Sequence, residues 1–361
     1  MSTQVGTDLK KVPFQNIWQG GPSSLVCTGV RDETSDVKTF FLRPSTASSF
    51  SYLPGQWISI GIAGEAAPLE RIYTLSSSPS RPDLASITVK RQSQGLMSSH
   101  LHKTLRPGMF LNASAPGGDF SFVHAPHDRY VFLSGGSGIT PLMSMSRYIC
   151  DLRLDHDVLF IHSARSPEDI IFRNEIDFLS RQHPHFEVRY LCDKMDEQRA
   201  WSGLTGYVNT DVLHRLVPDL EQREVFCCGP TAYMAKIRDI LAALGHPIER
   251  YHEESFGVSG PPPQQENPSN HQQTFSVSFP KISKTISCST DQTLLSAIRN
   301  AGIPISFSCQ KGICGACRTK KISGSVDMLH QGGIRPKDIE KGFILPCCSR
   351  PLSHVALEMS C

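Results

Sequence analysis

The stretch SCQKGICGACRTK, residues 308–320, and the later stretch ILPCCSRP, residues 344–351, carry the most decisive pattern in this sequence. The first contains the spacing C-x4-C-x2-C, and a further cysteine comes after 29 intervening residues, which gives the set Cys309, Cys314, Cys317 and Cys347. Thiolates are the soft ligands that iron bound to bridging sulfide prefers. The spacing therefore predicts a [2Fe–2S] cluster, a carrier of one electron at a time.

Spacing alone leaves two questions about the cysteines open. A structural zinc site would use the same ligands, although zinc sites usually pair two C-x2-C knuckles and this loop has one. The fourth iron ligand could be Cys347 or Cys348. The remaining isolated cysteines are expected to be core or surface thiols: Cys27, Cys150, Cys192, Cys288 and Cys361.

The composition is that of a soluble protein with two or three domains. A chain of 361 residues is too long for one core, and its 39% hydrophobic and 19% charged residues are ordinary values. No apolar run is long enough to span a bilayer, and the first residues, MSTQVGTDLKK, contain no signal core. We therefore expect a cytoplasmic location, reduced thiols and no membrane partner.

Charge is distributed unevenly along the chain. Residues 274–361 contain eleven lysines and arginines against five aspartates and glutamates, a net charge of +6, which leaves −4 for the rest. The excess is either an ordinary solvated surface or a means of steering this end of the chain toward acidic surfaces. No nucleic-acid partner is expected.

Three domains and a linker can be placed from local patterns. Residues 258–273, VSGPPPQQENPSNHQQ, are too rich in proline and amides to build a core and predict a linker before a last domain, 274–361. Residues 23–124 contain six short strands between Gly/Pro turns and one helix at 95–105, which predicts an antiparallel β-barrel.

Residues 125–257 alternate strand and helix patterns, which predicts a doubly wound α/β domain with a parallel sheet. Helices are expected at 140–152, 168–182 and 231–244. Strands are expected at 130–133, 157–162, 186–191 and 224–229, with a last one ending at Tyr251.

The α/β domain opens with a strand, a glycine loop and a helix: YVFLSGGSGITPLMSM, residues 130–145. Thr140 can cap the helix and Pro141 suits its first position. Such a helix N-terminus can face a pyrophosphate, with glycines permitting its close approach. A second marker, Cys228-Gly229-Pro230, ends a later strand, where ligands of such sheets bind.

The barrel offers a set of residues for a flavin. A hydride carries two electrons and the cluster takes one, so a cofactor that accepts two electrons together and releases them one at a time must lie between them. In the segment RIYTLSSSP, Arg71 can hold a phosphate, Tyr73 can lie against a ring and Thr74 can hydrogen-bond its edge. The helix that opens at Gly95 can hold the other phosphate.

These motifs, R-x-Y-[ST], G-x-x-S, GGSGITP, CGP and E-x-F, occur in the order of the ferredoxin–NADP reductase superfamily, which the chain resembles over residues 23–361. The resemblance implies a C-terminal plant-type ferredoxin domain of the α+β β-grasp class. In that family a proline follows the fourth cysteine by four residues, and Pro351 then favours Cys347. One departure is Thr74, where the family more often has serine.

The resemblance also assigns roles to residues. Arg71, Tyr73 and Thr74 would bind the flavin, and its pyrophosphate would lie on Gly95, Met97 and Ser98. The pyridine nucleotide would bind Gly136, Ser137, Gly138 and Thr140, with Cys228, Gly229 and Pro230 near the nicotinamide. The catalytic set would be Thr74, Cys228, Glu254 and Phe256, the last two beside the flavin ring.

By this resemblance the chain would be a reductase that passes electrons from NADH to FAD, to the cluster and to a partner protein. The partner expected is a Rieske-type oxygenase with an acidic docking face, such as a quaternary-amine demethylase; the alternatives are a hybrid-cluster protein as acceptor or a role as a redox-sensing module. FMN could replace FAD. NADPH could replace NADH because Arg165 could take a 2′-phosphate, although Glu168 and Asp169 would repel one.

Overall fold

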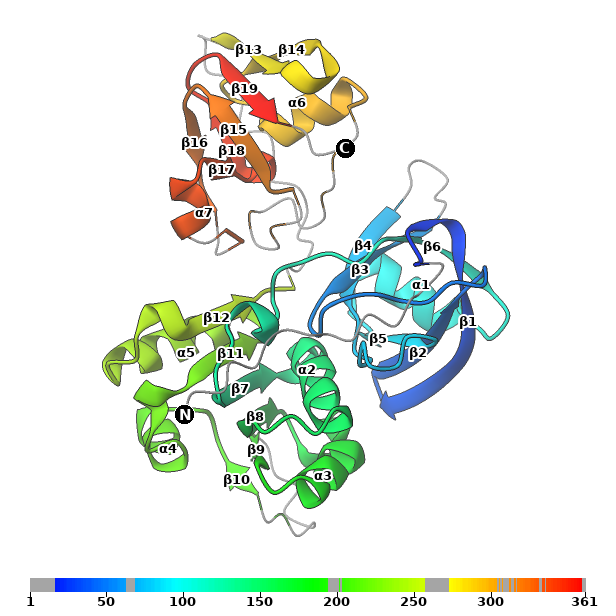
Figure 1. Ribbon diagram of the computed structural model, residues 1–361, viewed down its shortest axis with the longest axis vertical. Coiled ribbons are helices and arrows are strands. Elements are labelled where there is room, and N and C mark those ends of the chain that lie inside the picture. Colours follow the sequence, from blue (N-terminus) through cyan, green and yellow to red (C-terminus); the bar gives the residue numbers. More distant parts are fainter. Residues whose placement is uncertain are drawn as a thin grey trace, which may run out of the picture.

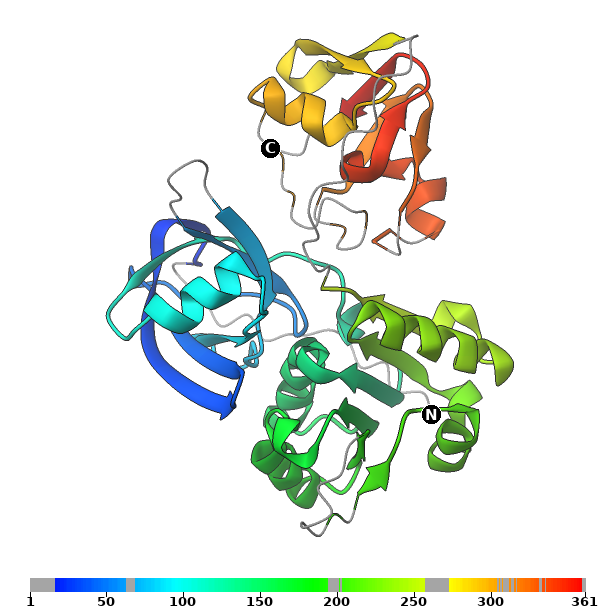
Figure 2. The same ribbon diagram turned by 180° about the vertical axis from the view of Figure 1, so that it is seen from behind.

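The computed structural model describes residues 17–62, 69–193, 201, 203–256, 273–303, 305, 307, 312, 315, 317–330, 333–334 and 336–358. They form a β-barrel and an α/β domain side by side, with a smaller α+β domain at one end (Figures 1 and 2). The predicted linker lies almost wholly outside the described residues. No helix in the described part of the chain is long and apolar enough to cross a membrane.

All paired strands of the barrel are antiparallel, as predicted. Its sheet has the order β4-β3-β6-β1-β2-β5, and a bridge between Leu75 and Ile87 joins the two outer strands. Alternate residues point inward around a core that includes Phe40, Ile58 and Ile60. Its elements are β1 (Gly20–Thr34), β2 (Val37–Pro44), β3 (Trp57–Ile62), β4 (Leu69–Thr74), β5 (Ala85–Lys90), α1 (Leu96–Thr104) and β6 (Phe110–Ser114).

The α/β domain has a fully parallel sheet with the order β10-β9-β8-β7-β11-β12. Helices α2 and α3 pack on one face and α4 and α5 on the other, so its strands are apolar on both sides. The elements are β7 (Arg129–Gly135), α2 (Ile139–Asp151), β8 (Asp157–Ala164), α3 (Arg173–Gln182), β9 (Phe186–Cys192), β10 (Leu204–Thr205), α4 (Thr210–Leu216), β11 (Glu224–Cys228), α5 (Thr231–Ala243) and β12 (Tyr251–Glu254).

Four local predictions for this domain were wrong. Helix α2 begins at Ile139 with Gly138 as its N-cap, so Thr140 is the second residue and donates to the Ser137 carbonyl at 3.3 Å instead of capping, and Pro141 is the third residue instead of the first. Helix α3 begins at Arg173, because a separate 3-10 turn occupies Pro167–Asp169. Strand β12 begins at Tyr251, where the sequence predicted its end. In addition, the short helix α4 and the short strand β10 were not predicted.

The last domain has a mixed sheet with the order β14-β13-β19-β15-β17. Only the central pair, β13 with β19, is parallel, and α6 packs on the sheet, which is the predicted β-grasp arrangement. The elements are β13 (Thr274–Phe279), β14 (Lys284–Ser289), α6 (Leu294–Asn300), β15 (Thr319–Ser323), β16 (Val326–Met328), α7 (Pro336–Glu340), β17 (Phe343–Ile344), β18 (Ser349–Pro351) and β19 (Val355–Glu358).

Candidate functional site

The glycine loop lies at the carboxyl edge of the parallel sheet, between β7 and α2. After β7 ends at Gly135, one 3-10 turn at Gly136–Gly138 leads directly into α2. A Cβ on Gly138 would lie 2.2 Å from the Cys228 carbonyl oxygen, so only glycine lets the loop pack against the end of β11. Gly136 has a φ of +52°, the left-handed region that glycine adopts without strain. The N-terminus of α2 therefore lies at the sheet edge, where an anionic group can approach.

The segment Cys228-Gly229-Pro230 forms the other wall of this edge. The Cys228 side chain is fully buried, and its burial, with Glu254 nearby, raises the thiol pKa well above the ordinary value. Its sulfur is therefore a neutral core group, and it is the Cys228 backbone that meets Gly138. Gly229 lies against Gly135 and the Tyr233 ring.

Two predicted site residues from different domains meet in the structure. Thr74 is the last residue of β4 in the barrel, and its Oγ1 donates to Oε2 of Glu254, the last residue of β12, at 3.3 Å. Glu254 is paired with Cys228 in the β11–β12 ladder. Phe256 follows and packs, partly buried, on the α/β core. The barrel strand and the nucleotide edge therefore converge on one point.

The remaining barrel residues lie on the same strand or on α1. Tyr73 is partly buried, which raises its phenol pKa, while Arg71 donates from Nη1 to the Glu70 carbonyl at 2.7 Å. On α1, the Met97 side chain is buried in the barrel core, so only its backbone amide can face a ligand. The Ser98 Oγ accepts from the Gln92 amide at 3.1 Å.

The glycine cradle and the first turn of α2 are suited to a dinucleotide pyrophosphate, and the Thr74 hydroxyl beside Glu254 is suited to the edge of a flavin ring. At the same edge, Nε2 of buried His162 makes no hydrogen bond with any described residue, while Nδ1 pairs with Ser134 Oγ at 2.7 Å. Buried polar atoms of this kind are expected to be satisfied by a ligand or water. The residues present therefore fit both cofactors.

Two of the four predicted cluster ligands are described, and both are buried. Cys317 and Cys347 are 3% and 6% exposed and pack in one group with Leu345. The Gly312 amide donates to Cys347 Sγ at 3.3 Å, as an amide does to a thiolate ligand. Gly312 has a φ of +70°, a conformation suited to glycine. Cys309 and Cys314 lie outside the described residues.

The neighbouring Cys348 is placed differently. Its Sγ contacts the Leu345 carbonyl at 3.5 Å and lies only 2.5 Å from where a Cβ on Gly312 would be. The sequence predicted Cys347 as the ligand on the position of Pro351, and the amide contact is a separate argument for the same choice.

Two groups of functional interest were missed by sequence reasoning. Ser144, Arg147 and Asp151 of α2 bind the segment that follows Thr74. Their i, i+3, i+7 spacing, a polar stripe on an otherwise apolar helix, could have revealed them. Asp119, after the barrel, pairs with Arg318, next to Cys317, at 2.5 Å. No local sequence signal connects residues 199 positions apart.

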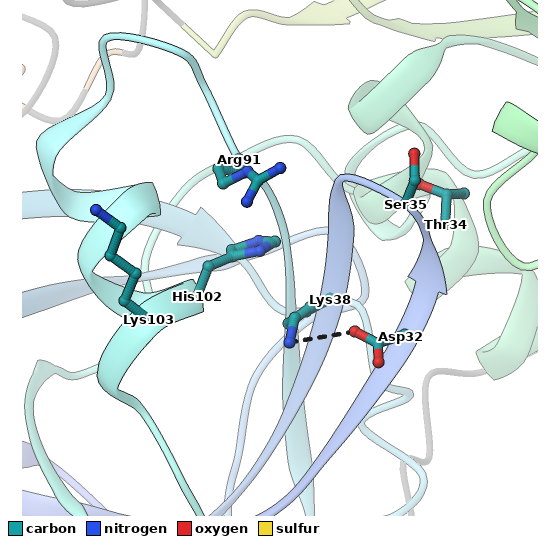
Figure 3. Close-up of a pocket in the computed structure, with 7 residues that line it drawn as sticks. All are labelled: Asp32, Thr34, Ser35, Lys38, Arg91, His102 and Lys103. Carbon is teal, nitrogen blue, oxygen red and sulfur yellow. Dashed lines mark ion pairs between the residues drawn. The ribbon is translucent and has the colours of Figure 1, made fainter.

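A cavity of about 580 Å³ opens on the barrel between the β1–β2 hairpin and α1 (Figure 3). None of its lining residues belongs to the predicted site, and Lys38 is paired with Asp32 at 3.3 Å. His102 Nε2 contacts the Val89 carbonyl at 2.8 Å. Arg91 and Lys103 complete a basic wall in Figure 3. We assign no role to this hollow.

Comparison with known proteins places three domain families on this chain. The oxidoreductase FAD-binding domain matches residues 26–122, the oxidoreductase NAD-binding domain residues 132–239, and the 2Fe-2S iron-sulfur cluster binding domain residues 280–352. The matches follow the barrel, the parallel sheet and the β-grasp domain.

Two curated relatives are similar along nearly their whole length. The glycine betaine monooxygenase reductase subunit of Chromohalobacter salexigens is 38% identical over 94% of this chain and 96% of its own. The stachydrine N-demethylase reductase subunit of Rhizobium meliloti is 38% identical over 98% and 99%.

Among solved structures, phthalate dioxygenase reductase has a TM-score of 0.59 at 23% identity, covering 93% of this chain and 97% of its own. A type IV self-sufficient cytochrome P450 monooxygenase has a TM-score of 0.74 at 23% identity, with 94% and 41% covered. At these identities the likeness concerns the fold.

Proposed function

Because this chain belongs to the oxygenase reductases of the ferredoxin–NADP reductase superfamily that carry a C-terminal [2Fe–2S] domain, we propose that its oxygenase partner demethylates a small quaternary amine. The chain itself is an oxidoreductase that passes electrons from a nicotinamide nucleotide through FAD and the cluster to that partner. The relatives named for glycine betaine and stachydrine, both quaternary ammonium compounds, support the proposed substrate class.

The observation that carries the reductase function is the contact of Thr74 with Glu254. It brings the end of the barrel strand to the edge of the nucleotide-binding sheet, so two cofactors bound there would meet. When bound, the flavin accepts two electrons and releases them singly, and the cluster carries one.

For the residues, we propose that Arg71 holds a flavin phosphate, Tyr73 covers the ring and Thr74 hydrogen-bonds its edge. Met97 and Ser98 offer backbone amides at the start of α1 to the flavin pyrophosphate, and Gly95, whose own amide donates to the Gln92 carbonyl at 3.0 Å, lies beside it as the N-cap. The pyridine nucleotide lies on Gly136, Ser137, Gly138 and Thr140. The Cys228-Gly229-Pro230 segment shapes the nicotinamide pocket through its backbone, with Glu254 and Phe256 beside the flavin.

The cluster ligands are proposed to be Cys309, Cys314, Cys317 and Cys347. The four parts of the chain are proposed to be 23–124, 125–257, the linker 258–273 and 274–361. We place the protein in the cytoplasm, where thiols stay reduced.

For the coenzyme, we propose NADH. Arg165, which could take a 2′-phosphate, contacts Asp169 at 3.1 Å and Asp36 at 3.4 Å. Two carboxylates already compensate the guanidinium and would repel a phosphate dianion. A ribose with free hydroxyl groups carries no such charge.

The acceptor is proposed to dock an acidic face on the cluster domain. Exposed basic residues of that domain include Lys320, Lys341 and Arg350. Leu329 is 74% exposed, and its amide donates to the Cys348 carbonyl at 3.0 Å, which puts an apolar side chain next to the cluster segment. Protein interfaces usually combine an apolar core with a polar rim, and this domain exposes both kinds of residue.

The experiment combines the purified chain, NADH, oxygen and candidate Rieske oxygenases with glycine betaine or stachydrine. Formaldehyde release that requires both proteins is expected, since oxidation of an N-methyl group releases it. If a hybrid-cluster protein were reduced far faster than every oxygenase, the alternative acceptor would be correct.

A further inference from the structure

One face of α2 carries three polar residues that bind the barrel. Ser144, Arg147 and Asp151 occupy positions i, i+3 and i+7, so they line one side of the helix. In Figures 1 and 2, α2 is the helix of the α/β domain next to the barrel. The contacts of these residues join two domains that the sequence treats as separate.

All three residues bind a single barrel segment, 76–81, that follows β4. Ser144 Oγ donates to the Ser77 carbonyl at 2.6 Å and accepts from the Gly55 amide at 3.3 Å. Arg147 Nη1 donates to the Ser76 carbonyl at 2.5 Å. Asp151 accepts from Arg81 at 2.6 and 2.9 Å.

Arg147 is held rigidly. It is 6% exposed, its Nε and Nη2 donate to the two carboxylate oxygens of Glu175 at 2.7 Å each, and its guanidinium lies 4.8 Å from the centre of the Phe172 ring. Burial alone would raise the pKa of Glu175, but the hydrogen bonds from Arg147, together with the positive charges of Arg147, Arg31 and Arg81, more than offset it, so the pKa lies below its ordinary value. Because two hydrogen bonds to Glu175 fix the plane of the Arg147 guanidinium, its remaining donor, Nη1, is held on the Ser76 carbonyl.

The two partners in this contact are the two elements that carry the proposed cofactor sites. Segment 76–81 begins two residues after Thr74, and α2 begins directly after the glycine loop. The Ser77 side chain is also tied into the barrel, through the Tyr52 hydroxyl at 2.8 Å and the Ser86 amide at 2.9 Å. A displacement of α2 relative to β4 would therefore break several buried contacts at once.

We propose that Ser144 and Arg147 are positioning residues for hydride transfer: they join α2 to the flavin strand, so that the nicotinamide and flavin sites keep one separation. The proposal rests on the reductase function and site roles given above. Reacting atoms must approach to about 3–3.5 Å, and a misplacement of 1 Å can cost about 100-fold in rate. Neither side chain needs to touch a cofactor to have this effect.

The test compares Ser144→Ala and Arg147→Lys with the control Arg223→Lys. Lysine keeps the charge but cannot bridge Ser76 and both oxygens of Glu175. Arg223 is also buried and bidentate, to Asp157 at 2.8 and 3.0 Å, yet its contacts with Asp157, Asp219 and Tyr130 lie within the α/β domain. It reports the effect of losing a buried arginine fork without opening the domain interface.

Two measurements are made on each protein. In the protein stripped of flavin, hydrogen exchange of segment 76–81 is expected to rise at least 10-fold in Arg147→Lys and Ser144→Ala and to stay unchanged in Arg223→Lys. In the loaded protein, flavin reduction at saturating NADH is expected to slow about 10- to 100-fold in the first two, with a larger deuterium isotope effect and little change in KM.

Wild-type exchange and wild-type flavin reduction in Ser144→Ala would overturn the proposal, and this variant decides the matter if Arg147→Lys does not fold. Equal slowing in Arg223→Lys would also overturn it, because the effect would then be a general loss of stability. If the wild type did not oxidise NADH at all, the proposed function would fail, while the exchange measurement would still test the coupling of α2 to the barrel.

Discussion

The ion pair between Asp119 and Arg318 predicts how the cluster domain docks on the rest of the chain. Arg318 follows Cys317, and its Nη1 lies 2.5 Å from Oδ2 of Asp119. The loop that contains Asp119 is paired with strand β3, because Trp57 of β3 forms a bridge with Gly117. Trp57 also pairs with Thr74 of β4, the strand that carries the proposed flavin site. The pair therefore joins the cluster segment to the flavin site through one short route.

The perturbation is Asp119→Asn, which removes the charge and keeps the shape. The two side chains are 33% and 45% exposed, so the pair contributes about 0.2–1 kcal/mol, as exposed pairs do. That corresponds to a loss of about 1.4- to 5-fold in the docked population. Arg318 keeps its contact with Asp338 at 3.5 Å, so the domain itself should not unfold.

The assay is anaerobic stopped-flow with NADH, following the flavin and cluster absorbance separately. Flavin reduction should be unchanged, while cluster reduction slows by about 1.4- to 5-fold at low salt. The difference should shrink at 1 M salt, where the screening length is about 3 Å. The exchange of charges, Asp119→Arg with Arg318→Asp, should recover much of the loss.

The matched control is Lys281→Gln. Lys281 pairs with Glu358 at 3.0 Å, also exposed, but within the cluster domain. Unaltered cluster reduction in Asp119→Asn, or equal slowing in Lys281→Gln, would refute the docking argument. So would a loss that the charge exchange makes worse.

Three further predictions concern the nucleotide loop, the cluster and pH. Gly138→Ala would press a methyl group to 2.2 Å from the Cys228 carbonyl, so NADH binding measured by titration should weaken at least 10-fold, and unchanged binding would remove the loop from the site. Cys347→Ser should abolish the visible spectrum of the cluster while Cys348→Ser keeps it; the reverse result would reassign the ligand. The pKa of Glu175 in the folded protein lies below its ordinary value of 4.5, so the unfolded chain binds more protons in acid. The stability that Glu175 contributes is therefore complete above about pH 4.5 and is lost as the pH falls through the lower pKa of the folded state. Acid unfolding of the Glu175→Gln variant, which should show a flatter pH dependence than the wild type, checks this prediction.

The sequence predicted most of the architecture because each domain has its own local period. Alternating apolar residues identified the barrel strands, and the regular alternation with helices identified the parallel sheet. The errors lie at element ends: Thr140 reads as an N-cap, yet the glycine loop continues the turn into α2 one residue earlier. The sequence pattern predicted one helix where the structure has a 3-10 turn at Pro167–Asp169 and a helix that begins at Arg173. Phe172, at φ +59°, lies just before that helix, and the sequence did not predict its left-handed conformation.

The residues of the candidate site also differ in how far the sequence can predict them. Motif residues such as Gly138 are visible in sequence because backbone geometry restricts them to glycine. The polar stripe that contains Arg147 can be seen in the sequence, but the partners of Arg147 cannot be predicted from it, because Ser76 and Glu175 lie far away along the chain. The burial of the Cys228 thiol likewise depends on the packed sheet rather than on its motif.

The two interfaces of this chain differ in the way that their two transfers require. The contact of α2 with segment 76–81 is buried, with a fixed arginine fork and a serine that bonds in two directions. Hydride transfer needs such rigidity, because it fails when the reacting atoms separate by an ångström. The contact between Asp119 and Arg318 is exposed, so salt or a competing carboxylate can replace it. A single electron can cross a wider and less exact gap, and the cluster domain must also release this contact to present its basic surface to an acceptor. The acidic acceptor face proposed above would then compete directly with Asp119 for Arg318, so the exposure that makes this pair weak also makes it exchangeable.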